Sequence, residues 1–193
     1  MRDYPKIWFL RHGQTEWNKA YRLQGQLDSP LTEQGLDDAK QQALLMPPIL
    51  ALGPAIYVSP LGRARQTADI ALDGADYVTD DRLMEVHAGD WQGQTREQVF
   101  AANPALAASR ANALEIYAAA PNGEGMQAFC ARVAGFLDGL TVPSVIVAHG
   151  LLGQVLRGIV RGMDMEEVGR LSNRQGCVYV LENGVETVLE APE

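Results

Sequence analysis

Two histidines, each followed by a glycine, stand at the ends of two short apolar stretches. The first stretch, residues 7–10, is followed at once by Arg11 and His12, and the second, residues 144–148, by His149. Both stretches have the length and the bulky residues of buried strands. Ligands of open α/β sheets bind beyond the carboxyl ends of the strands. If the two strands are neighbours in a parallel sheet, the two imidazoles share one site.

The chemistry that these residues favour is transfer of a phosphoryl group. A neutral imidazole is available near pH 7, because its ordinary pKa is about 6.5, and a nucleophile splits one hard displacement into two easier ones. We expect His12 to be that nucleophile, with Arg11 and Arg63 binding the phosphoryl oxygens. Arg63 would come from the start of the helix that follows a strand at residues 55–58, and a helix N-terminus is itself an anion site. His149 could donate to the phosphoryl oxygens if it is held protonated.

Release of an alkoxide also needs a proton donor, and Glu85 is the candidate. It is the only glutamate in a stretch of mixed polarity, residues 82–93, that is expected to be a loop. A carboxylic acid there would protonate the leaving oxygen and later activate water. Taken alone, a loop glutamate is more often an exposed surface residue. His87, two residues further on, is expected to lie at the rim.

A metal site is the rival explanation of the histidines. The chain has three histidines and two cysteines, and none of them stands at the spacing of a zinc site. We therefore expect no metal and no cofactor, with the protein's own cations stabilising the charge. Cys130 and Cys177 lie in apolar surroundings and are expected to be buried, reduced thiols.

Apolar strands that alternate with amphipathic helices predict an α/β fold. Strands are expected at residues 7–10, 55–58, 76–79 and 144–148, with a hairpin at 178–181 and 185–189 around the turn Asn183-Gly184. Helices are expected at 33–46, 61–72, 126–140, 151–161 and 164–171, and in an alanine-rich stretch at 95–117 that is interrupted at Asn103-Pro104. The long polar stretch 12–31 is expected to be a functional loop.

Local signals predict how two of these helices begin. Thr32 is expected to cap the helix at 33–46, and Ser59 the helix at 61–72, with Pro60 in its first turn. The buried face of the first helix is expected to carry its apolar residues: Leu36, Ala39, Ala43, Leu44 and Met46. Proline then ends that helix at positions 47 and 48.

Size and charge bound the class of protein. The chain of 193 residues suits a single domain over 1–193, with a helical insertion at about 86–125. The net charge of −8 argues against nucleic acid and anionic membranes as partners. No apolar run approaches the roughly 20 residues that span a bilayer, and the N-terminal apolar run is too short for a signal peptide. We expect a cytoplasmic protein whose oligomeric state is left open.

The ordered motifs of the chain resemble those of the histidine phosphatase superfamily, also called phosphoglycerate mutase-like. The motifs run through most of the chain: Leu10-Arg11-His12-Gly13-Gln14-Thr15-Glu16-Trp17-Asn18, Gln24-Gly25, Asp28-Ser29-Pro30-Leu31-Thr32, Gly35, Ser59-Pro60-Leu61-Gly62-Arg63-Ala64-Arg65-Gln66-Thr67-Ala68, Arg82-Leu83-Met84-Glu85, Gly89-Asp90-Trp91-Gln92-Gly93, Pro121-Asn122-Gly123-Glu124 and Val147-Ala148-His149-Gly150. The resemblance implies a three-layer sandwich, in which a mostly parallel central sheet carries helices on both faces.

The resemblance also implies roles for the site residues. His12 would be phosphorylated during turnover, Glu85 would donate and accept the proton, and residues 86–125 would form a lid that shapes substrate choice. Phosphate and substrate contacts would come from these residues: Arg11, His12, Gly13, Gln14, Thr15, Glu16, Trp17, Asn18, Gln24, Gly25, Arg63 and His149. Two positions depart from the family's pattern, since Gly125 follows Glu124 where serine is common, and Gln92 stands where an acidic residue is common.

The resemblance leaves the reaction open between a phosphatase and a mutase. The stretch from Glu85 to His149 is short beside that of the cofactor-dependent mutases, whose longer lid supplies extra basic residues. Within 86–125 there are two arginines against four acidic residues, so a second acidic group would find little to pair with. We therefore expect a metal-independent phosphomonoesterase that acts on a small monoester with an apolar or sugar-like body. The alternatives are a phosphoglycerate mutase-type phosphotransferase and a phosphate-dependent binding module.

Overall fold

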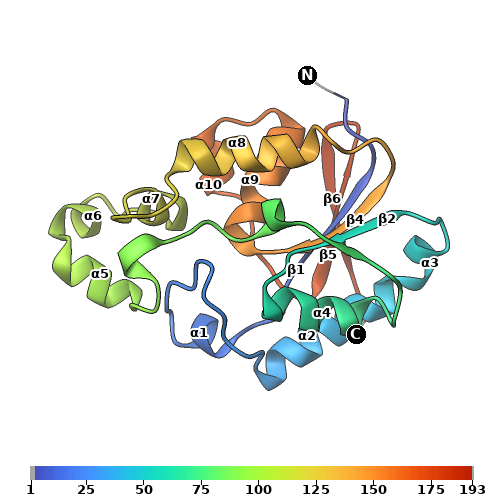
Figure 1. Ribbon diagram of the computed structural model, residues 1–193, viewed down its shortest axis with the longest axis horizontal. Helices are drawn as coiled ribbons and strands as arrows, with labels where there is room; N and C mark the ends of the chain where they lie inside the picture. The colour runs from blue at the N-terminus through green and yellow to red at the C-terminus, as the bar shows by residue number, and fades with distance from the viewer. Residues whose placement is uncertain (1–2, 193) are drawn as a thin grey trace.

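Six strands form one mixed, mostly parallel sheet in the computed structural model, which describes residues 3–192 (Figure 1). The strands are β1 (Ile7–Arg11), β2 (Ala55–Val58), β3 (Val78–Thr79), β4 (Ser144–Ala148), β5 (Cys177–Glu182) and β6 (Val185–Glu190). Their order in the sheet is β3-β2-β4-β1-β5-β6. The first four are parallel, and the hairpin β5–β6 adds two antiparallel strands. The expected α/β fold is confirmed.

Strands β1 and β4 are direct neighbours, as the histidine pattern predicts. Their parallel register pairs Arg11 with Ala148. The backbone N–H of His12 donates to the Ala148 carbonyl at 2.9 Å, which extends the pairing one residue beyond β1. The ring centres of His12 and His149 consequently lie only 5.2 Å apart.

Helices cover both faces of the sheet, with α8 and α9 on one face and α2 and α4 on the other (Figure 1). The helices are α1 (Glu16–Lys19), α2 (Glu33–Leu45), α3 (Pro47–Leu50), α4 (Gly62–Ala71), α5 (Arg96–Ala102), α6 (Pro104–Ala108), α7 (Ala113–Ala118), α8 (Met126–Leu137), α9 (Gly150–Arg161) and α10 (Met165–Gly169), with 3₁₀ turns at Asp81–Leu83 and Gly89–Trp91. Helices α5 to α7 gather to one side of the sheet.

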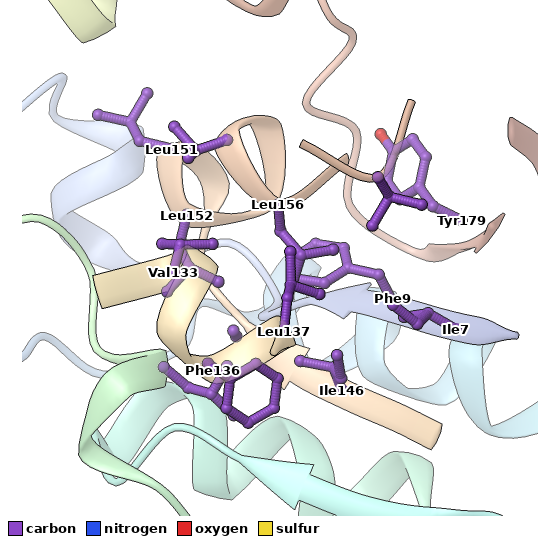
Figure 2. Packing of buried hydrophobic residues seen from close by; sticks show 14 of the residues in the cluster. Ile7, Phe9, Val133, Phe136, Leu137, Ile146, Leu151, Leu152, Leu156 and Tyr179 are labelled. Atoms are coloured by element: carbon purple, nitrogen blue, oxygen red, sulfur yellow. The ribbon is translucent and has the colours of Figure 1, made fainter. Parts of the chain in front are cut away.

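Alternating side chains of β1 divide the core into two layers. Ile7 and Phe9 face α8 and α9, where Figure 2 shows them among Leu137, Leu152 and Leu156. Trp8 and Leu10 face the opposite layer together with alanines of α4. Successive side chains of a strand point to opposite faces, so one strand can supply both layers. The register of β1 therefore also fixes the positions of Arg11 and His12 at its end.

A third, smaller cluster belongs to the region that was expected to be a lid. It contains Leu23 of the long loop and the following residues of 86–125: Ala88, Trp91, Val99, Ala111, Ile116 and Ala120. The alanine-rich stretch 95–117 is divided into three short helices, because it breaks at Asn103-Pro104 as expected and Asn112 caps a new helix with a capping box. This packing supports our proposal of one domain with an inserted lid.

Two expectations about helix ends and faces are wrong. Thr32 caps α2 as expected, but Ser59 does not cap α4, which begins after Leu61 with Pro60 outside its first turn. The buried face of α2 carries Asp38 and Gln42 as well as Ala39, whereas Leu44 is 63% exposed. Gln42 is buried because it pairs with backbone groups at the ends of strands: its amide donates to the carbonyls of Arg11 and Cys177.

Three other expectations need smaller changes. The loop 12–31 contains the short helix α1, and the prolines that end α2 begin a further turn, α3. The hairpin is confirmed, because Asn183 and Gly184 both have positive φ, as a two-residue turn of type I′ requires. Cys177 is buried but Cys130 is only half-buried, and both are free thiols.

We expect two helix glycines to respond in opposite ways to alanine. At Gly35 of α2 a Cβ would lie 2.0 Å from the backbone oxygen of Gln14, whereas at Gly135 of α8 it would meet no atom within 4 Å. Gly135→Ala should raise the free energy of unfolding by about 0.5–1 kcal/mol through helix propensity. Gly35→Ala should lower it by about 1–3 kcal/mol through overpacking. Urea unfolding measures both, and equal shifts would contradict the close approach.

Candidate active site

A cavity of about 160 Å³ opens at the carboxyl ends of β1 and β4. Its lining residues are Arg11, His12, Asn18, Arg22, Gln24, Arg63, Glu85, Ala113, Tyr117, Gly150, Leu151 and Asn173. Six of the residues expected from the sequence thus meet in one cavity, and His149 packs against His12 beside it. A larger hollow of about 650 Å³ lies between Tyr21 and Phe100, and none of its described lining residues is a histidine. The smaller cavity is the one that combines an imidazole, guanidiniums and a carboxyl group.

Hydrogen bonds of His12 fix which ring nitrogen carries the proton. Nδ1 lies 2.8 Å from the Gly13 carbonyl, which can only accept, so this nitrogen carries the hydrogen. Nε2 lies 3.3 Å from Nε–H of Arg63, which can only donate, so this nitrogen presents its lone pair. Burial, together with the charges of Arg63 and Arg11, lowers the pKa of His12 well below its ordinary value. The ring is therefore neutral near pH 7.

Arg63 is buried at the centre of a set of acceptors. Nη2 donates to the Gly25 carbonyl at 2.8 Å, and Nη1 donates to the Leu27 carbonyl at 2.8 Å and to Asp28 Oδ1 at 3.2 Å. Burial lowers the pKa of Arg63, while the charges of Glu85 and Asp28 oppose that shift. Its guanidinium is thus oriented before any ligand arrives. By contrast, Arg65 is exposed.

The N-terminus of α4 is not an open anion site, contrary to the sequence expectation. The Asp28 carboxylate accepts from the backbone N–H groups of Gly62 at 2.5 Å and Arg63 at 3.2 Å. A carboxylate from the long loop therefore caps this helix in place of Ser59. What α4 offers to a substrate is the Arg63 side chain alone.

Arg11 keeps one donor without a partner. Its Nη1 donates to the Asn173 carbonyl, and its backbone carbonyl accepts from Gln42 at 2.9 Å. Nε of Arg11 is buried with no hydrogen-bond partner. Burial lowers the pKa of Arg11, and the charge of Glu85 opposes that shift. An unpaired buried donor costs free energy until a ligand oxygen satisfies it.

His149 is neutral rather than held protonated. Burial, then the charges of Arg63, His12 and Arg11, lower its pKa well below the ordinary value. Its Nε2 lies 2.6 Å from the Ser59 hydroxyl, and its Nδ1 is buried without a partner. A neutral ring can still donate: if Ser59 donates to Nε2, the proton sits on Nδ1. A charged imidazolium is therefore not favoured, and donation by His149 to the phosphoryl oxygens stays a prediction for the neutral ring.

Glu85 is buried, with its carboxyl group at the N-terminus of α9. Oε1 accepts from the N–H groups of Val86 at 3.1 Å and Leu152 at 3.0 Å, and Oε2 accepts from Leu151 at 3.0 Å. Burial raises the pKa of Glu85, although these N–H groups and Arg63 oppose that shift. Oε1 already accepts two hydrogen bonds and Oε2 only one, so Oε2 is the oxygen with room for a transferable proton.

The residues between His12 and Asn18 have structural contacts and do not line the cavity. Gly13 packs against the backbone of α2, and the Gln14 side-chain oxygen accepts from the hydroxyl that caps α2. The Thr15 side chain caps α1, and Glu16 is exposed. The Trp17 backbone N–H donates to a serine hydroxyl of the same loop at 3.1 Å. These residues shape the loop that carries the lining residues.

Asn18 and Gln24 do line the cavity, and both are tied to Thr15. Asn18 Oδ1 accepts from the Thr15 N–H at 3.1 Å, and the Gln24 amide donates to the Thr15 hydroxyl at 2.7 Å. Oε1 of Gln24 is buried without a hydrogen-bond partner. Gly25 instead contributes a backbone carbonyl to Arg63 and has positive φ, so it acts on the site through Arg63.

Several residues of the site were not expected there from the sequence. Arg22, Tyr117 and Asn173 line the cavity, and Asp28 and Ser59 orient its charged groups. Asp28 and Ser59 do belong to the family-like motifs, so their position within a motif is the one signal that could have identified them. Tyr117 and Asn173 belong to none of the motifs, since one lies in the lid and the other in the loop before β5.

The two departures from the family pattern and His87 lie outside the cavity lining. Gly125 sits at the start of α8 with φ of +74°, a conformation that glycine adopts freely and serine does not. Gln92 accepts from the Gln26 N–H at 2.8 Å and lies 3.2 Å from His87 Nε2. His87 Nδ1 accepts from the Gly89 N–H at 3.1 Å, so its ring shapes the loop.

Within residues 3–192, no group of three or more histidine, cysteine and acidic side chains is arranged to hold a metal ion. None of the helices in that part of the chain is long and apolar enough to cross a bilayer.

Comparisons with known proteins show related sequences and a shared fold. A model of the histidine phosphatase superfamily (branch 1) matches residues 7–188. A protein of Enterobacter sp. (strain 638) named "Probable phosphoglycerate mutase GpmB" is 33% identical over 177 residues, or 88% of this chain and 80% of that protein. The solved structure "Bacillus stearothermophilus YhfR" has a TM-score of 0.79 at 28% identity and covers 96% of each chain. TTHB049 from Thermus thermophilus has a TM-score of 0.73 at 26% identity, over 97% of this chain and 99% of that one.

We expect the tautomer and pKa of His12 to be visible directly by NMR of the protein labelled with ¹⁵N-histidine. At pH 7 the His12 ring should be neutral with its hydrogen on Nδ1, and it should take up a proton only below the ordinary value of about 6.5. The spectrum of His12→Ala identifies the His12 ring signals, because they are missing there. The histidines of the urea-unfolded chain give the reference pKa. A hydrogen on Nε2, or a His12 pKa at or above the reference, would contradict the geometry.

Proposed function

Because the chain belongs to the histidine phosphatase superfamily (branch 1), we propose that it is a metal-independent phosphomonoesterase that works through a phosphohistidine at His12. The observation that carries the proposal is the fixed tautomer of His12, whose Nε2 lone pair is held beside Arg63. A nucleophile whose ring nitrogen is unprotonated, flanked by guanidiniums and a buried carboxyl group, suits attack on a phosphoryl group. The natural substrate belongs to the small-molecule phosphate esters.

In the first step Nε2 of His12 attacks phosphorus, and the bond from phosphorus to the ester oxygen breaks. Arg11 and Arg63 donate to the phosphoryl oxygens, and Nδ1 of His149 donates once its proton is placed there. Glu85 gives its proton to the leaving oxygen, so an alcohol departs rather than an alkoxide. The raised pKa of Glu85 supports this role, because it keeps the carboxyl group protonated to higher pH.

In the second step water attacks the phosphohistidine. The Glu85 carboxylate takes a proton from water as its oxygen bonds to phosphorus, and the bond from phosphorus to Nε2 breaks. Inorganic phosphate leaves, His12 returns to the neutral ring, and Glu85 is protonated again. Each group ends the cycle as it began. The backbone N–H groups of α9 support the step, because they stabilise the Glu85 carboxylate between the two proton transfers.

The lid residues at the cavity support a phosphatase with a modest, uncharged substrate body. The lid contributes Ala113 and Tyr117 to the lining. The lid arginines are elsewhere: Arg96 stacks on Phe100 and donates to a lid carbonyl, and Arg110 is exposed outside the lining. A second anionic group on the substrate would therefore meet no lid cation among the described lining residues. The net charge of −8 supports the absence of nucleic acid and anionic membranes among its partners.

A phosphoglycerate mutase-type phosphotransferase is the second candidate. Two observations favour it: relatives at 33% identity carry the name phosphoglycerate mutase, and Arg22 lines the cavity from the long loop. Arg22 uses Nη1 for the Gly93 carbonyl at 2.7 Å, so the rest of its guanidinium is available to a carboxylate. A pure binding module is disfavoured, because such a module needs no buried proton donor.

We expect turnover of p-nitrophenyl phosphate in the presence of EDTA, and its loss in His12→Ala. Removal of the nucleophile should lower kcat/KM by at least about 10⁴-fold, as for other covalent catalysts. His87→Ala is the matched control, because that ring lies outside the cavity lining, and it should retain most of the activity. Full activity of His12→Ala would overturn the phosphohistidine mechanism. Conversion of 3- to 2-phosphoglycerate without hydrolysis would favour the mutase.

We expect Glu85→Gln to discriminate between leaving groups. A glutamine cannot give up a proton, so kcat/KM for an alkyl phosphate should fall by about 10²- to 10⁴-fold. The loss for p-nitrophenyl phosphate should be much smaller, because that leaving group departs as a stable anion. Steady-state kinetics on both substrates tests this. Equal losses on both would show that Glu85 does not protonate the leaving oxygen.

A further inference from the structure

A second buried arginine lies away from the cavity and takes no part in the steps above. Arg157 of α9 is 1% exposed. Its guanidinium carbon lies 4.0 Å from the centre of the Tyr179 ring, and its Nη1 donates to Glu186 Oε1 of β6 at 3.0 Å. A buried guanidinium carries a large desolvation cost, and burial lowers the pKa of Arg157. The carboxylate of Glu186 and backbone carbonyls offset that cost, and these contacts show what the guanidinium holds in place.

The contacts of Arg157 and its neighbours hold the loop at residues 171–175. Nη2 of Arg157 donates to the Ser172 carbonyl. One turn earlier on α9, the Gln154 amide donates to the Leu171 carbonyl at 2.7 Å. The Tyr179 hydroxyl accepts from the Arg174 N–H at 2.7 Å. Buried side chains of α9 and β5 thus bind this loop through its backbone.

The same loop in turn holds the two residues that follow the core of β1. The Asn173 carbonyl accepts from Nη1 of Arg11, and the Gln175 amide donates to the His12 carbonyl at 2.9 Å. Asn173 also lines the cavity. Arg11 therefore receives its orientation from the carbonyl next to the one that Arg157 binds.

The helical spacing explains how one element reaches both sides of the site. Gln154, Arg157 and Arg161 are separated by three and four residues, which places them on one face of α9. The first turn of the same helix gives the N–H groups of Leu151 and Leu152 to the proposed proton donor. A rigid helix thus connects the proton donor to the loop that orients Arg11.

We propose that Arg157 is a positioning residue for the phosphate site. It holds the loop at 171–175 in place. The Asn173 carbonyl of that loop then orients the Arg11 guanidinium toward the phosphoryl group. This inference rests on the proposed function in one respect, namely that Arg11 is a phosphate ligand. It does not depend on whether the protein hydrolyses or transfers the phosphoryl group.

The experiment measures the affinity of the purified full chain for inorganic phosphate by titration calorimetry. Arg157→Met keeps the volume and the contact with Tyr179 but removes every donor, so phosphate should bind at least about tenfold more weakly, the effect of a lost charge-assisted hydrogen bond. Arg161→Met is the matched control, because Arg161 pairs with the same Glu186 through Oε2 at 3.2 Å but lies one turn further along α9. Its affinity should stay within about twofold of the original protein.

A double-mutant cycle separates positioning from a general loss of stability. In an Arg11→Gln background, Arg157→Met should cost less than about twofold further, because the residue acts through Arg11. Full additivity, or equal losses in the two methionine variants, would overturn the proposal. If Arg157→Met does not fold, Gln154→Leu carries the same cycle, since it releases the neighbouring Leu171 carbonyl, and unchanged affinity there would overturn the proposal too.

The two proposals fail in distinguishable ways. Arg11→Gln with unaltered phosphate affinity would overturn the positioning role, whatever the enzyme does. A protein that binds phosphate through Arg11 and Arg157 as described, but neither hydrolyses nor transfers a phosphoryl group, would overturn only the proposed function.

Discussion

The hydrogen bond from the His12 backbone N–H to the Ala148 carbonyl is the contact on which the rest of the site depends. It continues the parallel pairing of β1 and β4 one residue past β1, so that His12 lies beside the end of β4, where His149 follows. A shift of the register by one residue would move each side chain of β1 to the opposite face of the sheet. The hydrophobic layers therefore fix the register, and the register fixes the distance between His12 and His149.

Around that strand pair, the protein buries more positive charge than its own contacts neutralise. Backbone carbonyls orient both guanidiniums, but the Asp28 carboxylate pairs with Arg63 alone, and the Arg11 side chain donates to an uncharged carbonyl. In residues 3–192, three of the four buried side-chain atoms without a hydrogen-bond partner belong to the site: Arg11 Nε, Gln24 Oε1 and His149 Nδ1. Buried polar groups without a partner cost free energy. The oxygens of a phosphoryl group can satisfy Arg11 Nε, and His149 Nδ1 when that nitrogen carries the hydrogen, whereas Gln24 Oε1 is an acceptor and needs a donor.

The sequence could predict the parts of this arrangement that follow from strand periodicity. His12 and His149 were identifiable because each ends an apolar run, and Arg63 because it follows the next strand. Asp28 and Ser59 were not, because their contacts cross between elements far apart in the chain: one caps a helix from a distant loop and the other supports an imidazole. The polar residues on the buried face of α2 could not be predicted for a similar reason. A helix that covers the end of a strand must pair with its free backbone groups, so Asp38 accepts from the Gln14 N–H and Gln42 donates to the Arg11 carbonyl where leucine would leave both unpaired.

The central claim is that Nε2 of His12 carries the phosphoryl group during turnover, and the most direct measurement is to trap that species. Rapid acid-free quenching during turnover, with ³¹P NMR of the denatured chain and peptide mapping, identifies both the residue and the nitrogen. We expect phosphate on Nε2 of His12, accumulating further in Glu85→Gln with a substrate whose leaving group needs no proton. Phosphate on Nδ1, on His149, or on no residue while turnover proceeds would contradict the claim.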